Sequence, residues 1–331
     1  MKALITGATG FVGSAVAKIL CESNHEVRVL IRPSSVLKNL EDMDVECVTG
    51  DLTDPASLKP AVKGCDLLFH VAADYRLWVP RPDEIYRVNV QGTENIIKAA
   101  MDAGVKRICY TSSVATLGLN SDGTPADEDT PVCIDQMIGH YKRSKFMAEE
   151  RVSQLVRQDG APVVIVNPST PVGPRDIRPT PTGRMVLDAA SGKMPAYVDT
   201  GLNFVHVDDV AKGHLLAMER GKIGRRYILG GTNLTLRQVL GMIAEITGRR
   251  PPVIKLPHNL ILPVAWAAET WCRLTGRGEP LATVEGIRLA KKIMFFTSKR
   301  ARQELGYTSR PVEQALRDAI QWFEANGYMK C

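Results

Sequence analysis

Two polar side chains one helical turn apart could carry out proton transfer. They are Tyr141 and Lys145, in the stretch GHYKRSK at residues 139–145. Residues four apart share a helix face, so the lysine can reach towards the tyrosine. A free phenol has a pKa of about 10, too high for a base at neutral pH, and a neighbouring cation is needed to lower it. The alternative is two polar residues on a solvated helix.

A glycine-rich turn near the N-terminus predicts a nucleotide site. The stretch TGATGFVG follows the apolar strand expected at residues 3–6 and contains Gly7, Gly10 and Gly13. Glycines at these places let the backbone turn tightly, approach a pyrophosphate and pack the next helix against the sheet. The N–H groups at the helix start then face the phosphates. The position after a strand favours a dinucleotide-binding turn over a merely glycine-rich one.

The end of the second expected strand distinguishes NADP from NAD. An acid there holds the ribose hydroxyls of NAD, whereas an arginine accommodates the 2′-phosphate of NADP. The chain has Arg32 at this place and has no acid from 28 to 36. Ser34, Ser35 and Lys38 could add donors. NADP(H) is therefore the preferred cofactor and NAD(H) the alternative, although a solvent-facing arginine would look the same in the sequence.

The order of elements predicts an α/β fold with a Rossmann-type doubly wound parallel sheet. Apolar strands alternate with stretches of helical spacing, which indicates βαβ units covered on both faces. The expected strands cover residues 3–6, 26–31, 45–48, 66–72, 107–112 and 162–167.

We expect two domains. The dinucleotide-binding Rossmann domain comprises residues 1–170 plus about 203–225, and a smaller C-terminal α/β substrate lobe comprises about 171–202 plus 226–331. Residues 171–202 are rich in Pro, Gly and Thr, which predicts a long ordered loop into the substrate lobe.

Composition excludes several other classes of protein. Hydrophobic content of 44% and charged content of 24% are typical of a soluble globular protein. The 7 cysteines are scattered without a C-x-x-C pair, and the 6 histidines lack ligand spacing, so we expect reduced thiols, no metal and a cytoplasmic location. The net charge of +6 is modest, and its densest basic run, at 291–302, could attract phosphate groups. Nothing resembles a nucleic-acid-binding motif.

Membrane segments are not expected either. The glycine-rich turn begins where a signal peptide would lie. The most apolar later segment, residues 259–268, is too short to span a bilayer and contains Pro263. We expect it to be a buried helix under a lid, with a helix lying on a membrane surface as the alternative, so peripheral membrane contact stays open.

The motifs, taken in order, resemble those of extended short-chain dehydrogenases/reductases, and the match runs along nearly the whole chain. Within that superfamily the chain looks most like the dihydroflavonol-reductase-like branch. The segments HVAADYRLW, YTSSVATLG, GHYKRSK and NPSTPVGPRDIRPTPTGR are similar to the hopanoid-associated sugar epimerase family. The shared motifs are TGATGFVG, GDL (50–52), HVAA (70–73), NVQGT (89–93), YTSS (110–113), YKRSK and NPSTPVGPRD (167–176).

The resemblance implies a catalytic triad. Tyr141 would be the acid/base, and Lys145 would lower its pKa and hold the nicotinamide ribose. The second serine after YT, Ser113, would polarise the substrate oxygen, which leaves Ser112 structural. Ser113 is expected at the carboxyl end of a parallel strand, where such sheets bind ligands.

The same resemblance implies the cofactor contacts, several of which could instead be packing or turn residues. They are Gly7, Gly10, Phe11, Val12, Gly13, Arg32, Lys38, Asp51, Leu52, Val71, Ala72, Ala73, Asn89, Tyr141, Lys145, Pro168, Ser169 and Thr170.

One departure from the pattern concerns the substrate. Relatives that act on nucleotide-diphosphate sugars carry Arg-Asp before the aromatic of F-x-H-V-x-D, where this chain has Leu202 and Asn203. Leucine cannot replace a guanidinium fork on two phosphates, so a UDP- or GDP-sugar substrate is in doubt. The candidate substrate residues are Tyr75, Arg76, Trp78, Arg175, Arg178 and Arg184, with Trp78 equally suited to a core position.

These observations favour an NADP(H)-dependent oxidoreductase acting on a carbonyl or hydroxyl carbon of a small polyol, sugar-like or lipid-linked substrate in hopanoid biosynthesis. The alternatives are an epimerase that uses the same triad for transient oxidation and retains its NAD or NADP, and a nucleotide-sensing module without chemistry. The resemblance also implies a homodimer through the helices near 84–103 and 141–158.

Overall fold

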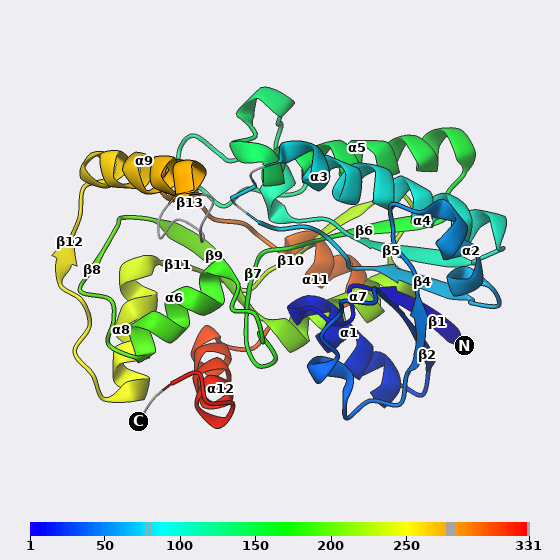
Figure 1. The fold of residues 1–331 in the computed structure, drawn as a ribbon, viewed down its shortest axis with the longest axis horizontal. Coiled ribbons are helices and arrows are strands. Elements are labelled where there is room, and N and C mark those ends of the chain that lie inside the picture. Colours follow the sequence, from blue (N-terminus) through cyan, green and yellow to red (C-terminus); the bar gives the residue numbers. More distant parts are fainter. Residues whose placement is uncertain (77, 80, 276–282, 330–331) are drawn as a thin grey trace.

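A seven-stranded parallel sheet forms the centre of the protein. The computed structural model describes residues 1–76, 78–79, 81–275 and 283–329. The strand order is β10-β6-β5-β4-β1-β2-β3, and every neighbouring pair is parallel (Figure 1). The expected Rossmann-type α/β fold is therefore confirmed. The strands are β1 (Lys2–Thr6), β2 (Glu26–Ile31), β3 (Glu46–Thr49), β4 (Leu67–His70), β5 (Arg107–Thr111), β6 (Val163–Pro168) and β10 (Arg226–Leu229).

Helices cover both faces of this sheet, because alternate strand residues are apolar on both sides. Ala3 and Ile5 of β1 enter one core with the first group of helices, and Leu4 enters the opposite core with the second group (Figure 1). The first group is α1 (Phe11–Glu22), α7 (Val207–Arg220) and α11 (Lys299–Leu305). The second is α2 (Pro55–Val62), α4 (Gly92–Asp102) and α5 (Gly139–Asp159).

The chain reverses its direction across the sheet between β1 and β4. Strands β1 to β3 run outwards on one side, and β4 to β6 run outwards on the other. In sheets of this kind the crevice at the carboxyl ends of the two central strands binds the ligand. The residues after β1, β4 and β5 therefore define the place of the site.

The smaller lobe is built around the strand β9. This strand (Gly201–His206) pairs in parallel with β7 (Thr170–Val172) and β13 (Ile293–Met294) and antiparallel with β11 (Thr232–Thr235). A separate pair joins β8 (Ala196–Tyr197) to β12 (Ile254–Lys255). The lobe has its own apolar core, which includes Phe204 and Leu234. Its helices are α6 (Pro181–Ala190), α8 (Leu236–Thr247) and α12 (Val312–Ala325).

Strands β9 and β10 each belong to a different sheet from the one in which the expected domain limits placed them. Strand β10 follows residue 225 but extends the seven-stranded sheet, and residues 203–206 belong to β9 of the smaller lobe. The reason is that α7 turns the chain back beneath the large sheet, where it packs on α1 and leads directly into β10 beside β6.

The loop expected over residues 171–202 contains a helix and three strand segments, so that expectation was wrong. Helix α6 begins at Pro181 and is capped by Thr180, whose hydroxyl accepts the N–H of Gly183. A capping threonine followed by proline is a helix-start signal that the proline-rich composition concealed.

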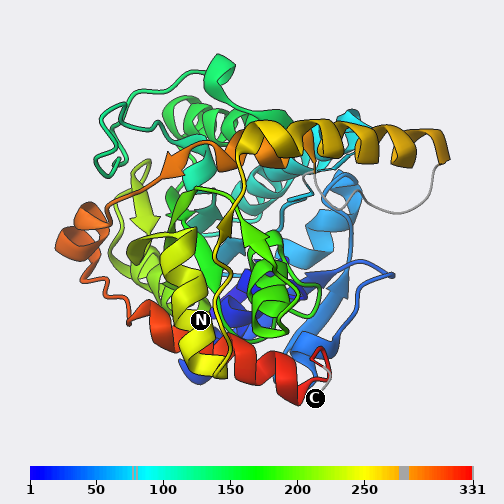
Figure 2. The same cartoon turned by 90° about the vertical axis from the view of Figure 1, so that its left-hand side faces the viewer.

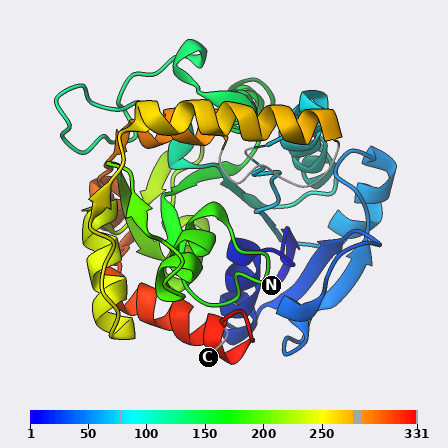
Figure 3. The ribbon, with the colours of Figure 1, turned by 60° about the vertical axis from the view of Figure 1, so that its left-hand side comes forward.

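A long helix, α9 (His258–Thr275), crosses the outside of the molecule and packs against α10 (Val284–Ala290) (Figures 2 and 3). Ala265 is fully buried, whereas Leu260, Trp271 and Leu274 are exposed. The expectation of a buried helix for residues 259–268 was therefore wrong for the outer face of α9. Within the described ranges, every helix is too short or too polar to traverse a bilayer.

Candidate active site

The glycine-rich turn after β1 is shaped for close backbone approach. Gly7 has a φ of +77°, and a Cβ added there would lie 2.7 Å from the Cα of Ala72. A Cβ on Gly13 would lie 2.0 Å from the carbonyl oxygen of Gly7. Helix α1 then begins at Phe11 after Gly10, without a capping side chain, so its first N–H groups remain available for an anion. These features fit the pyrophosphate of a dinucleotide.

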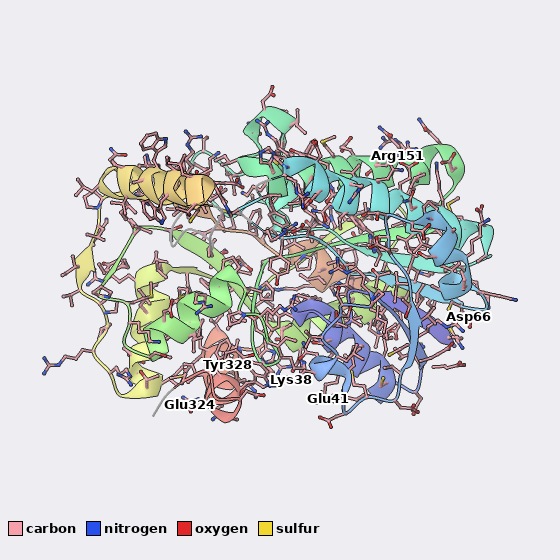
Figure 4. All side chains as sticks on the ribbon, in the orientation of Figure 1. Lys38, Glu41, Asp66, Arg151, Glu324 and Tyr328 are labelled. Carbon is pink, nitrogen blue, oxygen red and sulfur yellow. The ribbon has the colours of Figure 1, made fainter. Side chains whose placement is uncertain are left out.

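The candidate phosphate-binding cations follow β2 on the surface. Arg32 and Lys38 are exposed, and Lys38 is labelled in Figure 4. The hydrogen bonds from Thr53 hold the pKa of Asp51 below its usual value, and the charges of Arg32 and Arg87 contribute to the same shift. Arg32 therefore lies close to the carboxylate expected at the adenine. Arg87 also lies close to this carboxylate, and no motif in the sequence predicted its role.

Ser113 and Tyr141 meet at the carboxyl end of β5. Ser113 follows that strand, and its Oγ accepts the N–H of Ala115 at 3.1 Å at the start of a short 3-10 turn. Tyr141 lies in the first turn of α5, beside Ser113. Burial raises the pKa of the Tyr141 phenol, and the neighbouring Ser113 side chain opposes that rise. Tyr141 is therefore protonated at neutral pH.

Lys145 lies one turn further along α5 and is buried. Its Nζ donates to the carbonyl oxygen of Thr111 at 2.8 Å and to the Tyr110 hydroxyl at 3.2 Å. Burial lowers the pKa of Lys145 to about 8, while the charge of Glu149 acts in the opposite direction. The Lys145 ammonium contacts the end of β5, and the expected lowering of the Tyr141 pKa by Lys145 stays a prediction.

A buried polar network supports this arrangement from behind. Glu149 Oε2 accepts hydrogen bonds from Thr116 Oγ1 and from Asn167 Nδ2, both at 2.9 Å. Asn167 Nδ2 also donates to the carbonyl oxygen of Ser113 at 3.1 Å. Glu149 Oε1 accepts from Arg226 at 3.1 Å. The motifs did not identify Glu149, although its place four residues after Lys145 put it on the same helix face.

Replacing Glu149 by glutamine should lower the free energy of unfolding by about 1 kcal/mol, because it removes the charge-assisted bond to Arg226, a side chain that is 34% exposed. The amide oxygen can still accept from Thr116 and Asn167. Denaturant unfolding measures the change, and Glu150→Gln on the exposed side of α5 is the control. An equal loss in both variants would contradict a role for the network.

Asn89 connects the loop after β4 to α5. Its Nδ2 donates to Ser144 Oγ at 2.9 Å and to the Asp74 carbonyl oxygen at 2.8 Å, while its Oδ1 accepts the Asp74 N–H at 2.7 Å. Asn89 lies in the π-helical turn Arg87–Gln91 that follows α3 (Pro82–Tyr86). Both of its amide hydrogens are therefore bound within the protein.

His70 at the end of β4 is buried beside the same region. Its ring nitrogens hydrogen-bond to Thr6 Oγ1 at 2.7 Å and Thr93 Oγ1 at 2.9 Å. Burial, followed by the charge of Lys145, lowers the pKa of His70 to about 3. The imidazole is therefore neutral and joins β1, β4 and α4 without adding charge to the site.

Other expected cofactor residues line the same edge of the sheet. Val71, Ala72 and Ala73 follow β4 and are half-buried, and Leu52 after β3 is buried. Pro168 ends β6, and Thr170 begins β7. The buried Oγ atoms of Ser112 and Ser169 have no hydrogen-bond partner within the described residues. Polar atoms of this kind suit a bound polar ligand, which agrees with the glycine turn.

The substrate candidates do not form one group. The side chain of Arg76 is ion-paired with Asp74, and Arg175 is ion-paired with Asp208 and has a φ of +77°. Arg178 and Arg184 are exposed, as is Tyr75, while Trp78 is half-buried. The guanidinium groups of Arg76 and Arg175 are thus already engaged by carboxylates.

The structure also shows the contacts of Leu202 and Asn203, which stand where nucleotide-sugar relatives carry Arg-Asp. Asn203 is buried, where its Oδ1 accepts the N–H of Gly231 at 2.8 Å and its Nδ2 donates to Asn233 Oδ1 at 2.7 Å. Leu202 packs beside the core of the smaller lobe. In the part of the chain that the structure describes, no three His, Cys, Asp or Glu side chains are grouped to hold a metal ion.

Comparison with known proteins agrees with the fold. The NAD dependent epimerase/dehydratase family matches residues 3–230, and the chain belongs to that family. A putative dihydroflavonol 4-reductase of Synechocystis sp. is 44% identical over 98% of this chain and 95% of its own. Sterol demethylase protein B of Methylococcus capsulatus is 35% identical over 99% of both chains. These likenesses confirm the resemblance to extended short-chain dehydrogenases/reductases with dihydroflavonol-reductase-like relatives.

Solved structures give the same result. The crystal structure of gox2253 is 56% identical, with a TM-score of 0.89 and 99% of both chains covered. A nucleoside-diphosphate-sugar epimerase from Pseudomonas aeruginosa is 29% identical, with a TM-score of 0.81 and coverage of 100% of this chain and 99% of that one.

Proposed function

We propose that the protein is an NADP(H)-preferring oxidoreductase that reduces a carbonyl group of a polyol, sugar-like or lipid-linked substrate. The observation that carries this proposal is the placement of a protonated Tyr141 beside Ser113, with Lys145 one turn further along α5. A phenol that keeps its proton at neutral pH is suited to donate it. The proposed direction is therefore reduction.

In this mechanism side chains of the protein donate the proton and stabilise the negative charge that develops on the carbonyl oxygen. When bound, the nicotinamide supplies the hydride. The Ser113 hydroxyl would orient the carbonyl oxygen, and Tyr141 would donate its proton to that oxygen as negative charge develops there. Lys145, held at the Thr111 carbonyl, would place a positive charge near the phenolate that remains.

We propose the same residues for the cofactor as the motif resemblance implies, and the shape of the glycine-rich turn supports this. The turn Gly7–Gly13 and the start of α1 would bind the pyrophosphate, and Asp51 and Leu52 would lie at the adenine. Arg32 and Lys38 would bind the 2′-phosphate, because arginine forms paired hydrogen bonds to phosphate. Residues 168–170 would flank the nicotinamide.

The substrate class is supported by two observations. Leu202 and Asn203 provide no guanidinium for a diphosphate, and Arg175 is engaged by Asp208. The similar proteins include a putative dihydroflavonol 4-reductase and sterol demethylase protein B, whose names indicate non-nucleotide substrates. The assignment to hopanoid biosynthesis rests on the motif resemblance, with a polycyclic lipid intermediate as the substrate.

A sugar epimerase is the second candidate, favoured by the nucleoside-diphosphate-sugar epimerase of similar structure. The two candidates differ in net redox change. Mixing the protein with NADPH and a panel of polyol-derived, keto-sugar and isoprenoid ketones should show net NADPH oxidation for a reductase. Tightly retained NAD or NADP, released only on denaturation, with no net oxidation for any compound, would favour the epimerase and contradict the reductase.

The reductive rate should fall as the pH rises above about 8, because Lys145 then loses the charge that offsets the phenolate. The sign follows from the lowered pKa, since the lysine is protonated below that value. The rate of NADPH oxidation over a pH series measures the effect. In Lys145→Arg the falling limb should move to higher pH, because arginine stays charged. An unmoved limb would contradict the assignment.

We also infer a cytoplasmic homodimer formed through α4 and α5, as in the resemblance. Arg151 of α5 binds Glu94 of α4 with two hydrogen bonds, of 2.9 and 2.7 Å, so these helices form one unit (Figure 4). Light scattering after gel filtration gives the mass in solution, and a monomer would contradict the dimer.

A further inference from the structure

The outer face of α9 is an unbroken apolar surface. At 100° per residue, Leu260, Val264 and Trp271 lie within one narrow sector, and their exposed fractions are 67%, 63% and 70%. Leu274, 81% exposed, and Ala267 continue the same stripe, and Pro263 lies at its edge. Figures 2 and 3 show that α9 crosses the outside of the molecule. We call these six residues the apolar face of α9.

The opposite side of α9 is fixed to the protein. Ala265 is buried, and Glu269 Oε1 accepts the N–H of Val284 in α10 at 2.7 Å. Glu269 is the one acid in the sequence of α9, and it points away from the apolar face. The orientation of the helix is therefore set by its own polar contact, and its apolar residues are left outside.

Positive charge borders this face. Lys291 Nζ donates to Asn259 Oδ1 in the first turn of α9 at 2.9 Å. Arg288 and Lys292 are exposed on the neighbouring segment, and the sequence has no acid from 286 to 303. An apolar helix face with tryptophan and a cationic border is the pattern of a helix that lies at a membrane surface.

The same unit touches the catalytic helix. Glu285 of α10 lies against Gly139 and His140, directly before Tyr141 in α5. A Cβ on Gly139 would lie 1.5 Å from Glu285 Oε1, so the glycine allows this close contact. Helix α10, which packs against α9, therefore lies beside the turn that carries Tyr141.

We propose that the apolar face of α9 docks on an anionic phospholipid surface. Leu260, Trp271 and Leu274 would enter the acyl boundary, and Arg288, Lys291 and Lys292 would meet the headgroups. A second copy of the chain fits less well, because a two-fold contact through this face would bring the basic borders together. Docking does not depend on the proposed reaction, but the delivery of a membrane-dissolved substrate to Tyr141 rests on it.

Flotation with lipid vesicles tests the proposal. The protein should float with vesicles of equal parts phosphatidylglycerol and phosphatidylcholine, and much less with phosphatidylcholine alone. Trp271→Ser and Leu274→Ser should each lower the apparent partition coefficient about tenfold. The matched control is Ile223→Ser, which changes a 54% exposed side chain in the loop after α7. Thermal melting verifies that each variant is folded.

The charged border has its own readout. Lys291→Glu with Lys292→Glu should lower binding to the anionic vesicles by about fivefold or more for each charge removed. Raised salt should weaken binding of the unmodified protein, since exposed charges are screened.

Three outcomes would overturn the proposal. They are absence of flotation, equal flotation of Trp271→Ser and Ile223→Ser, and a change of oligomeric state in Trp271→Ser without vesicle binding by the unmodified protein. The last would assign the face to a contact between copies. Flotation is scored without turnover, so a failed reductase assay would leave this result independent.

Discussion

Replacing Tyr141 by phenylalanine should lower the turnover number by about 10² to 10⁴-fold while leaving NADPH affinity within a few fold. The phenol is protonated at neutral pH and lies beside Ser113. Phenylalanine keeps the ring and removes only the proton donor, so the packing of α5 should survive. The rate of NADPH oxidation with an active ketone and a fluorescence titration of NADPH measure the two quantities.

Tyr328→Phe is the matched control for Tyr141→Phe. The Tyr328 hydroxyl donates to the carbonyl oxygen of Ile177 at 2.7 Å, at the C-terminal end of the chain and away from α5 (Figure 4). Its loss should lower the free energy of unfolding by about 1 kcal/mol and leave turnover unchanged. A Tyr141→Phe protein that retains turnover would exclude the proposed proton donor, and a nucleotide-sensing module would then be the better interpretation.

Replacing Arg32 by alanine should raise the dissociation constant for NADPH by about 10 to 100-fold and leave that for NADH nearly unchanged. The guanidinium is exposed at the end of β2, near Asp51, where a 2′-phosphate would be placed. NADH lacks this phosphate, so the ratio of the two constants isolates the contact.

Arg157→Ala is the control for the loss of one positive charge. Arg157 lies exposed in the last turn of α5, and its removal should change both dissociation constants equally and slightly. If Arg32→Ala weakens the binding of NADPH and of NADH to the same extent, Arg32 does not bind the 2′-phosphate. Tight NAD in the purified protein would point to the same conclusion and favour the epimerase.

Much of the nucleotide-binding half could be predicted from sequence because its signals are local. The strands are short apolar runs, and Gly13 is required by its backbone contact with Gly7 in the same turn. Tyr141 and Lys145 follow from helix periodicity, and Ser113 follows from its motif. The shared location of these residues depends on parallel strands ending at one edge, which the alternating pattern predicts.

The remaining features depend on contacts that no local pattern specifies. Strand β10 belongs to the large sheet because α7 returns the chain there, and Glu149 matters because Asn167 and Arg226 reach it from other strands. The arginines of the loop after β7 looked available in the sequence, yet Arg175 is engaged by Asp208. The outer face of α9 resembles a buried helix in composition, since hydrophobicity alone does not distinguish a core from an exposed apolar surface.

Strand β9 has consequences for how the chain folds during synthesis. The first six strands of the large sheet are complete at residue 168, and consecutive strands are neighbours in the sheet except β3 and β4, because β4 pairs with β1. Strand β9 cannot complete its pairing until β11 and β13 have been synthesised, and β13 ends at Met294. Since domains fold from the N-terminus as they emerge, the nucleotide-binding half should become protease-resistant on the ribosome well before the smaller lobe. Proteolysis of stalled chains of increasing length would show two separate steps, with the second appearing only after β13 has left the exit tunnel.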